Sequence, residues 1–393
     1  MQIGFNLPNS GPLSAVDRMT RIAVEGEAMG FDYLTMTDHV VLPDTRVPGY
    51  PYSESGEFYE DAPLERHEQL IGMAYIAAKT SRIRLVAAVL VVPHRPAVLS
   101  AKMLATLDVL SGGRLTVGIG AGWLKTEFDA VVTTPFPERG AVTDEYIDAF
   151  KVLWTESSPK FSGKYSKFDG IVLEPKPVQK PHPPIWVGGE GPAALRRAAR
   201  IGDAWYPIGS NNQHLLDTLP RLQTGIARLR EAEKKAGRVP GSVGVAFRVK
   251  RYGAAVPPKA NDGERRLFSG SEADLIADFR ALKQLGVGAI DIDFGRPTTE
   301  AVLADYAAQG TLMPAWRFDL ADRSVYARRS LCVQFNETDL AFLQRLWAEE
   351  GLFTWFEHEG RPTDLPHLGR HTPTGAGDRH GPCDGRTPRR DRR

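Results

Sequence analysis

The chain has 393 residues, of which 42% are hydrophobic and 25% are charged, and its formal net charge is +1. These proportions are typical of a soluble globular protein, and the balanced charge argues against nucleic acid or a membrane surface as a partner. No run of about 18 apolar residues is present, so we expect no membrane span. The start of the sequence lacks the basic and apolar regions of a leader peptide, and Cys332 and Cys383 both lie near its end, so we expect a cytoplasmic protein without a disulfide framework.

Short β-type runs alternate with amphipathic helical stretches over residues 1–312. Eight strands are expected at Ile3–Pro8, Tyr33–Asp38, Arg84–Val92, Leu115–Gly120, Pro184–Gly188, Ala204–Ile208, Val243–Lys250 and Ala289–Phe294. Helices are expected at Ala15–Met29, Leu64–Lys79, Ala97–Leu110, Val142–Trp154, Ala193–Ile201, Leu215–Ala236, Glu272–Leu285 and Thr299–Ala308. Because each strand is followed by a helix, the pattern favours a closed parallel (β/α)8 barrel over an open doubly wound sheet. The near-continuously apolar strands fit a sheet that is covered on both faces.

Two connections are longer than ordinary loops of such a barrel. Val40–Pro63 follows the second strand, and Thr155–Pro183, which is rich in proline, precedes the fifth. A long loop after the C-terminal end of a barrel strand lies over the active site. Val40–Pro63 is therefore either a lid or substrate wall, or a mobile excursion of the surface.

The character of the sequence changes after residue 312. Residues 313–360 hold two short apolar runs and one amphipathic helical stretch, which are too few elements for an ordinary core. Residues 361–393 are rich in Arg, Pro and Gly and contain few aliphatic side chains. We expect a small irregular extension followed by a disordered basic tail.

A glycine-rich turn follows the fifth strand. The apolar run Ile185–Val187 ends in Gly188, Gly189 and Gly191, and Pro192 then occupies the first turn of a helix. Uncovered backbone N–H groups at the positive end of a helix are suited to bind a phosphate. An ordinary turn between a strand and a helix has the same pattern, so the motif alone leaves both interpretations open.

Asp38 and His39 stand at the end of the second strand, where barrel enzymes carry catalytic residues. A histidine there can donate or accept a proton near neutral pH, and the neighbouring carboxylate can assist it or hold a ligand hydroxyl. The alternative is a structural histidine at the rim of the barrel.

Small residues mark the ends of the third and fourth strands. Ala88 and Val89 end the third strand and leave room for a planar ring, although a tightly packed core strand is the alternative. Gly120 and Gly122 lie on one face at the end of the fourth strand, where a ligand can approach the backbone closely. Trp123 follows and is suited either to a pocket wall or to the core.

Other catalytic signatures are missing from the sequence. No GxSxG or P-loop motif occurs, and residues 1–312 hold no HxxxH motif, which argues against covalent hydrolysis and zinc chemistry in the barrel. No metal site is therefore expected. A bound organic cofactor that supplies the chemistry remains.

Five segments, in this order, resemble the bacterial luciferase-like monooxygenase superfamily, and most closely its branch that uses coenzyme F420, a 5-deazaflavin. The segments are Phe31–Tyr33 with Thr37–His39, Leu107–Arg114, Gly118–Trp123, Glu174–Gln179 and Pro183–Gly189. The resemblance covers roughly residues 1–310 and implies a TIM-type barrel with a flavin or deazaflavin at its C-terminal mouth.

The resemblance assigns roles to particular positions. It implies a non-prolyl cis peptide at Ala88–Val89 behind the cofactor ring, phosphate binding at Gly188, Gly189 and Gly191, a pair beside the ring at Asp38 and His39, and a segment over the cofactor at Gly120 and Gly122. Trp123 stands where some sugar-phosphate-oxidising members carry an acidic residue, which implies a more apolar substrate pocket.

The implied activity is F420-dependent transfer of a hydride between C5 of the deazaflavin and a small organic substrate, with His39 handling one proton. An FMN-dependent monooxygenase that uses separately reduced flavin and O2 is the alternative, and a cofactor-binding barrel without turnover is a third reading. Members of the superfamily often pair, which implies a homodimer.

The segment after the barrel resembles a different family. Residues 316–360, including Arg328–Leu340, resemble an internal fragment of a VgrG-type spike protein of type VI secretion. This resemblance implies a fusion, and it leaves open a secretion-associated interaction protein that acts through residues 316–360.

Overall fold

The computed structural model describes residues 1–45, 47–53, 56–58, 65–295 and 301–302, together with the backbone of residues 352–355 and 367–370. The chain divides into two compact units, Met1–Leu312 and Met313–Arg393. The first unit carries the expected barrel.

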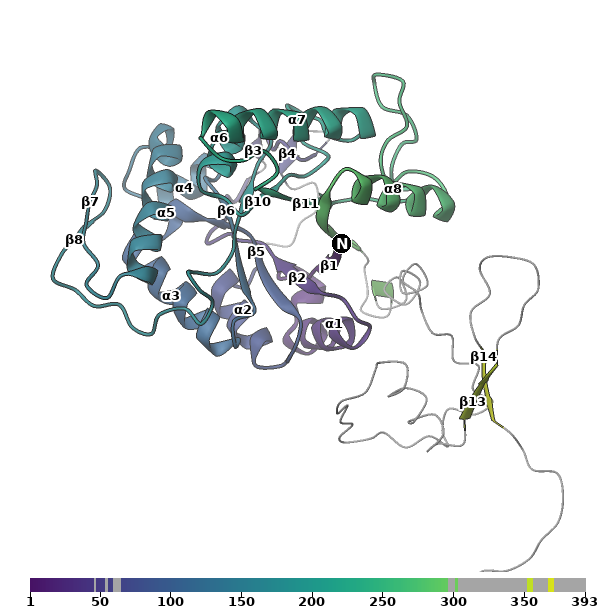
Figure 1. The fold of residues 1–393 in the computed structure, drawn as a ribbon, viewed down its shortest axis with the longest axis horizontal. Coiled ribbons are helices and arrows are strands. Elements are labelled where there is room, and N and C mark those ends of the chain that lie inside the picture. The colour runs from purple at the N-terminus through teal and green to yellow at the C-terminus, as the bar shows by residue number, and fades with distance from the viewer. Residues whose placement is uncertain are drawn as a thin grey trace, which may run out of the picture. The chain divides into compact units, whose positions relative to one another are not determined.

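Eight parallel strands close into a barrel (Figure 1). They are β1 (Gln2–Asn6), β2 (Tyr33–Met36), β5 (Arg84–Val91), β6 (Leu115–Gly120), β9 (Ile185–Gly188), β10 (Ala204–Tyr206), β11 (Gly244–Val249) and β12 (Val287–Ile292), and β12 pairs with β1 to complete the ring. The order around the barrel follows the order along the chain. The expected (β/α)8 fold is confirmed.

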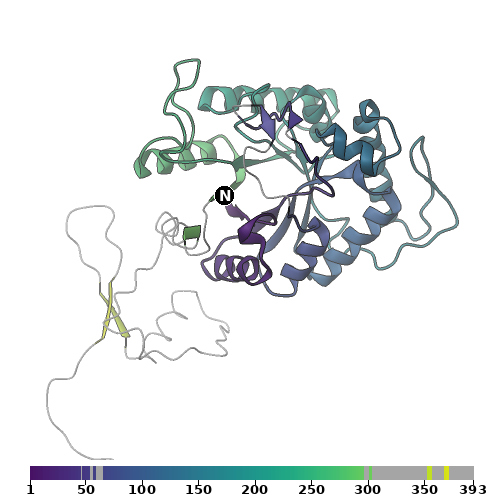
Figure 2. The same ribbon diagram turned by 180° about the vertical axis from the view of Figure 1, so that it is seen from behind.

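Helices surround the strands, as the two opposite views show (Figures 1 and 2). They are α1 (Val16–Ala28), α2 (Gln69–Ala77), α3 (Ala97–Leu110), α5 (Arg139–Thr155), α6 (Pro192–Ile201), α7 (Leu219–Lys235) and α8 (Glu272–Gln284). The sequence did not predict α4 (Lys125–Val131), which has seven residues and is too short to show a periodic apolar face. Of the expected helix Thr299–Ala308, only Ala301 and Val302 lie within the described residues, and both are helical.

Two buried tryptophans join neighbouring elements of the barrel by side-chain hydrogen bonds. The indole N–H of Trp154 in α5 donates to the carbonyl of Ala101 in α3 at 2.9 Å. The indole N–H of Trp205 in β10 donates to the carbonyl of Gly189 at 2.8 Å. Since both side chains are fully buried, these bonds satisfy polar atoms that would otherwise be costly to bury. The second bond fixes the glycine turn after β9 against its neighbouring strand.

The two long connections each contain a short antiparallel pair. β3 (Val47–Pro48) pairs with β4 (Glu57–Phe58), and β7 (Phe161–Ser162) pairs with β8 (Lys167–Phe168). The β3–β4 pair belongs to the loop that follows β2, and its side chains reach the mouth of the barrel, as described below.

In the second unit, β13 (Leu352–Trp355) pairs antiparallel with β14 (His367–Arg370). β14 falls inside the stretch expected to be disordered, so the structure differs from that expectation at four residues. Backbone hydrogen bonds to the apolar run of β13 supply the order that its own composition does not predict. The other expected elements of residues 313–393 lie outside the described residues.

Candidate active site

The end of β5 carries the bulge that the resemblance implies. The peptide bond between Ala88 and Val89 is cis, and the register between β5 and β6 shifts between Ala87 and Leu90. The side chain of Val89 extends over the neighbouring strands at this point. The non-prolyl cis peptide is therefore present at the residues for which it was expected.

Glycines in the two following strands make room for this bulge. A Cβ atom on Gly120 would lie 2.6 Å from Cγ2 of Val89, and one on Gly188 would lie 2.8 Å from Cγ1 of the same residue. A Cβ atom on Gly118 would lie 2.1 Å from the carbonyl oxygen of Ala87. Since real Cβ atoms do not come this close to other atoms, only glycine fits at these positions. Val89 thus packs against the glycine face of β6. Contact between this face and a cofactor remains a prediction.

Gly122 lies at the exit from β6. Its φ of +83° belongs to the left-handed region that favours glycine, and its carbonyl accepts a hydrogen bond from Nε of Arg139 at 3.0 Å. A Cβ atom there would lie 2.9 Å from Cγ1 of Val91. The turn is therefore packed closely against the end of β5 and directs Trp123 toward the loop that follows β2.

His39 is held by a buried carboxylate. Its Nδ1 atom lies 2.7 Å from Oε2 of Glu127, which is in α4. Oε1 of Glu127 accepts the backbone N–H of Val40 at 2.6 Å, and the Glu127 side chain is 1% exposed against 13% for His39. Because a carboxylate only accepts hydrogen bonds, Nδ1 of His39 carries the proton, and Nε2 is left as the proton acceptor.

A second histidine lies beside the same carboxylate. Nδ1 of His94 is 3.9 Å from Oε1 of Glu127, and it has no hydrogen-bond partner in the described part of the chain. Burial lowers the pKa of His94, against the opposing effect of Glu127. A neutral His94 leaves the carboxylate of Glu127 to His39.

The carboxylate of Asp38 is bound by Arg95 and the backbone of Val91. Its two carboxylate oxygens accept hydrogen bonds from the two terminal nitrogens of Arg95, both at 2.9 Å, and Oδ2 also accepts the backbone N–H of Val91 at 2.9 Å. The carboxylate is completely buried. Asp38 therefore joins the end of β2 to the end of β5, and the cofactor contact expected of it stays a prediction.

Aromatic rings from the loop after β2 form a wall beside His39. The rings of Tyr50 and Phe58 lie 5.0 Å apart, and each lies close to Trp123, with centroid distances of 5.0 and 4.9 Å. The ring of Phe58 is 5.3 Å from that of His39. The described residues of Val40–Pro63 thus pack against Trp123 and His39, and a role of this wall in substrate binding stays a prediction. Trp123 belongs to this wall rather than to the core.

The glycine turn after β9 has the form expected of a phosphate site. Gly189 has a φ of +100°, and Gly191 is the N-cap of α6, a helix of ten residues, with Pro192 in its first turn. Gly191 supplies no side chain to cap the helix, so backbone N–H groups of the first turn face outward. A Cβ atom on Gly191 would lie 3.2 Å from Nε2 of His214, which places an imidazole beside this helix end.

Glu190 lies in the same turn, but its carboxylate is bound elsewhere. It accepts the backbone N–H of Ile208 at 2.7 Å, the amide of Asn211, and the hydroxyl of Tyr52 at 3.2 Å. Burial raises the pKa of Glu190 to about 7, against the opposing effect of these hydrogen bonds. The carboxylate is thus held by the loop after β10. Through Tyr52 it is also held by the loop after β2, whose described residues within Val40–Pro63 we call the wall loop.

These residues fit a cofactor with a flat ring and a phosphate. The cradle of glycines around Val89, the uncapped start of α6 and the histidine held by Glu127 all lie at the C-terminal ends of strands β2, β5, β6 and β9. The carboxylate of Glu190 does not occupy the helix end, since it is engaged with Ile208 and Asn211. In the described residues no group of three His, Cys, Asp or Glu side chains forms a metal site.

Polar side chains lie inside the barrel below its mouth. Arg248 in β11 approaches Oδ2 of Asp291 at 3.3 Å, and its Nη2 atom donates to Oδ1 of Asn6 at 2.8 Å. The hydroxyl of Tyr206 donates to Oδ1 of Asp291 at 2.7 Å. Burial raises the pKa of Asp291 to about 6, against the opposing effect of Arg248.

Three residues of the site were not singled out from the sequence. Glu127 is 88 positions from His39, and no local pattern connects the two. Arg248 and Lys250 left a readable signal, because they alternate at the end of a strand whose other side chains are apolar. Period two places both on one face of the strand, where cations at a barrel mouth indicate a ligand.

No helix in the part of the chain that the structure describes is both long and apolar enough to cross a membrane.

Comparison with known proteins supports these observations. An FMNH(2)-dependent dimethylsulfone monooxygenase of Pseudomonas putida is 29% identical over 265 residues, covering 57% of this chain and 73% of the relative. An uncharacterised protein of Mycobacterium tuberculosis is 32% identical over 267 residues, covering 67% of this chain and 86% of that protein.

Solved structures share the fold. The monooxygenase RslO1 from Streptomyces bottropensis matches with a TM-score of 0.61 at 22% identity, covering 80% of this chain and 98% of that one. An F420-dependent secondary alcohol dehydrogenase in complex with an F420–acetone adduct matches with a TM-score of 0.59 at 18% identity, covering 77% and 96%. At these identities the likeness shows the barrel fold alone.

Two families match successive parts of the chain. Residues 293–388 match the phage tail baseplate hub (GPD) family, which supports the resemblance of the C-terminal segment to a spike protein. A role for residues 316–360 in secretion stays a prediction, since they lie almost wholly outside the described residues. Residues 1–289 match the luciferase-like monooxygenase family. The chain therefore belongs to the luciferase-like monooxygenase family and is an oxidoreductase with a flavin-type cofactor.

Proposed function

We propose that this chain is an F420-dependent oxidoreductase that exchanges a hydride with a small organic substrate in the cytoplasm. The observation that carries the proposal is the orientation of His39, whose Nδ1 atom is held 2.7 Å from Glu127. A deazaflavin, when bound, supplies the hydride chemistry and does not readily activate oxygen. The protein then has to position the substrate and manage one proton.

In this proposal His39 takes up or returns that proton at Nε2. Glu127 fixes the tautomer and the ring orientation, and it stabilises the imidazolium once the proton has arrived. Asp38 is a positioning residue, because its bonds to Arg95 and to Val91 N–H tie the His39 segment to the bulge at Ala88–Val89.

The remaining predicted residues would bind the cofactor and surround the substrate. Gly188, Gly189 and Gly191 would hold its phosphate at the start of α6, while Val89 would support the ring and Gly120 and Gly122 would line the cofactor site. Tyr50, Phe58 and Trp123 would exclude water from the substrate.

A second cofactor has a specific observation in its favour. The relative from Pseudomonas putida is named as an FMNH(2)-dependent monooxygenase, and it is more similar in sequence than the F420-dependent solved structure quoted above. The second proposal is therefore an FMN-dependent monooxygenase that uses separately reduced flavin and O2. The glycine turn and the bulge are compatible with either ring.

The test is a titration of the purified full chain with F420 and, separately, with oxidised and reduced FMN, followed by fluorescence and absorbance. We expect saturable binding of F420. Binding of FMN without binding of F420 would contradict the first proposal and favour the second.

Turnover of F420 with propan-2-ol and longer secondary alcohols then tests His39. In His39→Ala we expect turnover to fall by about 100-fold while the Kd for the cofactor changes by less than about twofold. His182→Ala is the control, because His182 precedes β9 and lies at the other end of the barrel strands. Unchanged turnover in His39→Ala would show that His39 carries no proton in the reaction.

A further inference from the structure

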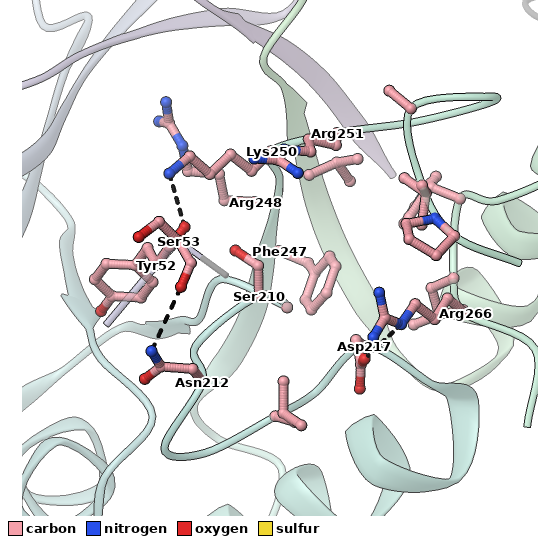
Figure 3. A pocket seen from close by; sticks show the side chains of 18 residues that line it. Tyr52, Ser53, Ser210, Asn212, Asp217, Phe247, Arg248, Lys250, Arg251 and Arg266 are labelled. Carbon is pink, nitrogen blue, oxygen red and sulfur yellow. Dashed lines mark hydrogen bonds and ion pairs between the residues drawn. The ribbon is translucent and has the colours of Figure 1, made fainter. Parts of the chain in front are cut away.

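A cavity of about 140 Å³ lies beside the wall loop. It is bordered by the tip of that loop at Tyr52 and Ser53, by the loop after β10, and by the end of β11 with the loop that follows (Figure 3). Since β10 and β11 contribute their C-terminal ends, the cavity opens at the same end of the barrel as His39.

Cationic side chains dominate the polar part of this cavity. Arg248, Lys250, Arg251 and Arg266 line it, against one carboxylate, that of Asp217. Asp217 already pairs with Arg221 at 2.6 Å and with Arg266 at 3.2 Å, as Figure 3 shows for the second pair. Arg248 is likewise balanced by Asp291 inside the barrel. Carboxylates therefore neutralise Arg248 and Arg266, whereas no carboxylate among the described residues pairs with Lys250.

Lys250 is a half-buried cation held by neutral groups of the wall loop, including the ring of Tyr50, whose centroid lies 4.8 Å from Nζ. Its Nζ atom donates to the carbonyl oxygen of Tyr52 at 2.9 Å and to the hydroxyl of Tyr50 at 3.3 Å. Among the described residues no carboxylate oxygen lies within 4.0 Å of Nζ. Burial lowers the pKa of Lys250 to about 8; Asp293 opposes this effect, and Arg248 and Arg251 add to it. A ligand with a negative charge would supply the missing partner.

The rest of the cavity wall is apolar. Phe247, Val256 and Leu267 line it, and Figure 3 shows Phe247 between Tyr52 and Ser53 on one side and Asp217 and Arg266 on the other. The ligand that suits this lining has one anionic group and an apolar body.

The cavity is connected to the catalytic histidine through the aromatic wall. Tyr50 contacts Lys250 by its hydroxyl and Phe58 by its ring, and Phe58 contacts His39. A substrate held at Lys250 would thus run along the rings that lead to His39.

We infer that this cavity binds the carboxylate end of an organic substrate, with Lys250 as its principal cation. The inference rests on the proposed function, since it names the class of substrate that the same active site would take. In this inference Lys250 selects the substrate by its negative charge, and His39 still transfers the proton.

The test compares hexanoate with hexanamide, its neutral isostere, by isothermal titration of the full chain without cofactor. A charge-assisted hydrogen bond predicts that hexanoate binds about tenfold or more tightly than hexanamide. Equal affinities would overturn the inference, and this comparison requires no variant.

Two lysine variants locate the site. In Lys250→Met we expect the preference for hexanoate to disappear, while Lys250→Arg retains it. Lys79→Met is the matched control, because Lys79 also lies over a tyrosine ring, 5.4 Å from Tyr75, but follows α2 at the opposite end of the barrel. A preference that survives in Lys250→Met, with an unchanged melting temperature, would contradict the assignment.

A further titration separates substrate from cofactor as the source of the carboxylate. With the protein saturated by F420 or FMN, hexanoate binding should persist if the cavity serves the substrate. Loss of hexanoate binding would show that the cofactor's own anionic tail occupies the cavity, and it would overturn the substrate assignment. Failure of both cofactors to bind would instead contradict the proposed function and leave the hexanoate result intact.

Discussion

The Nδ1 atom of His39 lies 2.7 Å from Oε2 of Glu127, although the two residues are 88 positions apart in the sequence. The same carboxylate binds the backbone N–H of Val40, so it fixes both the ring and the chain beside it. This pair leaves Nε2 of His39 as the proton acceptor at the barrel mouth.

Replacing Glu127 with Gln tests this relationship without changing the size of the side chain. The amide can donate to Nδ1 of His39, which forces the proton onto Nε2 and removes the acceptor. We expect kcat for the alcohol reaction to fall by about 10- to 100-fold, while KM and the Kd for the cofactor change by less than about threefold. An unchanged kcat, or a loss that lies wholly in cofactor binding, would contradict the positioning role.

The pair between Asp38 and Arg95 predicts a large effect on stability. Asp38→Asn leaves the buried guanidinium of Arg95 with Glu68 as its remaining anionic partner, and we expect the free energy of unfolding to fall by about 3 kcal/mol. Urea denaturation measures the change. Asp148→Asn is the control, since the exposed pair of Asp148 and Arg200 should contribute less than about 1 kcal/mol. Equal losses in the two variants would show that the buried pair is not special.

The contact between Gly120 and Val89 predicts a clash that a second substitution relieves. In Gly120→Ala the new methyl group would lie 2.6 Å from Cγ2 of Val89, and we expect a loss of about 1–3 kcal/mol. Val89→Ala in the same chain removes that atom and should recover most of the loss. Gly288→Ala is the matched control, because a Cβ atom there meets only the carbonyl of Val245 at 3.8 Å. Additive losses in the double variant would contradict the packing described here.

Glu190 predicts a dependence of stability on pH. Burial raises its pKa from 4.5 to about 7, so the folded protein binds one more proton than the unfolded chain between these values. The stabilising contribution is full below the lower value and is lost as the pH rises through the upper one. Tyr52, Asn211 and the N–H of Ile208 face this carboxyl.

Glu190→Gln removes this titration. Between about pH 5 and pH 8, we expect the variant to gain more than about 1.4 kcal/mol of unfolding free energy relative to the natural chain. Parallel stability curves for the two proteins would show that Glu190 does not titrate in this window.

The barrel could be predicted from the sequence because the residues that begin and end its helices and strands lie next to those elements in the chain. Ala97–Leu110 and Leu115–Gly120 agree with α3 and β6 at both ends, since Pro96 opens the helix and Gly112 and Gly113 form the turn between the two elements. His39 was recognisable because it ends a strand. These signals need no knowledge of distant residues.

The rest of the site depends on tertiary contacts that no local pattern carries. The sequence suggested that Gly120 leaves space for a ring, and the structure places the side chain of Val89 in that space. The partner of Asp38, Arg95, lies 57 positions away, so the sequence did not predict their ion pair, and contact of Asp38 with the cofactor stays a prediction. The alternation of Arg248 and Lys250 could have been read from the sequence, but the contacts of Lys250 with Tyr50 and Tyr52, about 200 positions away, could not.

The central claim is that the start of α6 binds the phosphate of the cofactor. Asp at Gly191 needs no strained backbone, because a φ of −72° is open to any residue, although its Cβ atom would lie 3.2 Å from Nε2 of His214 and the imidazole would have to shift by a few tenths of an ångström. Its carboxylate would cap the helix while occupying the phosphate position. Asn at the same position caps the helix without the charge and is the matched control.

The decisive measurement is the Kd for F420 and for FMN in Gly191→Asp and Gly191→Asn, by fluorescence titration, alongside the melting temperature of each variant. We predict that neither variant is destabilised, that Asp weakens binding of the preferred cofactor by about tenfold or more, and that Asn weakens it by less than about threefold. Equal Kd values for the Asp and Asn variants would contradict the claim that the phosphate lies at this helix end.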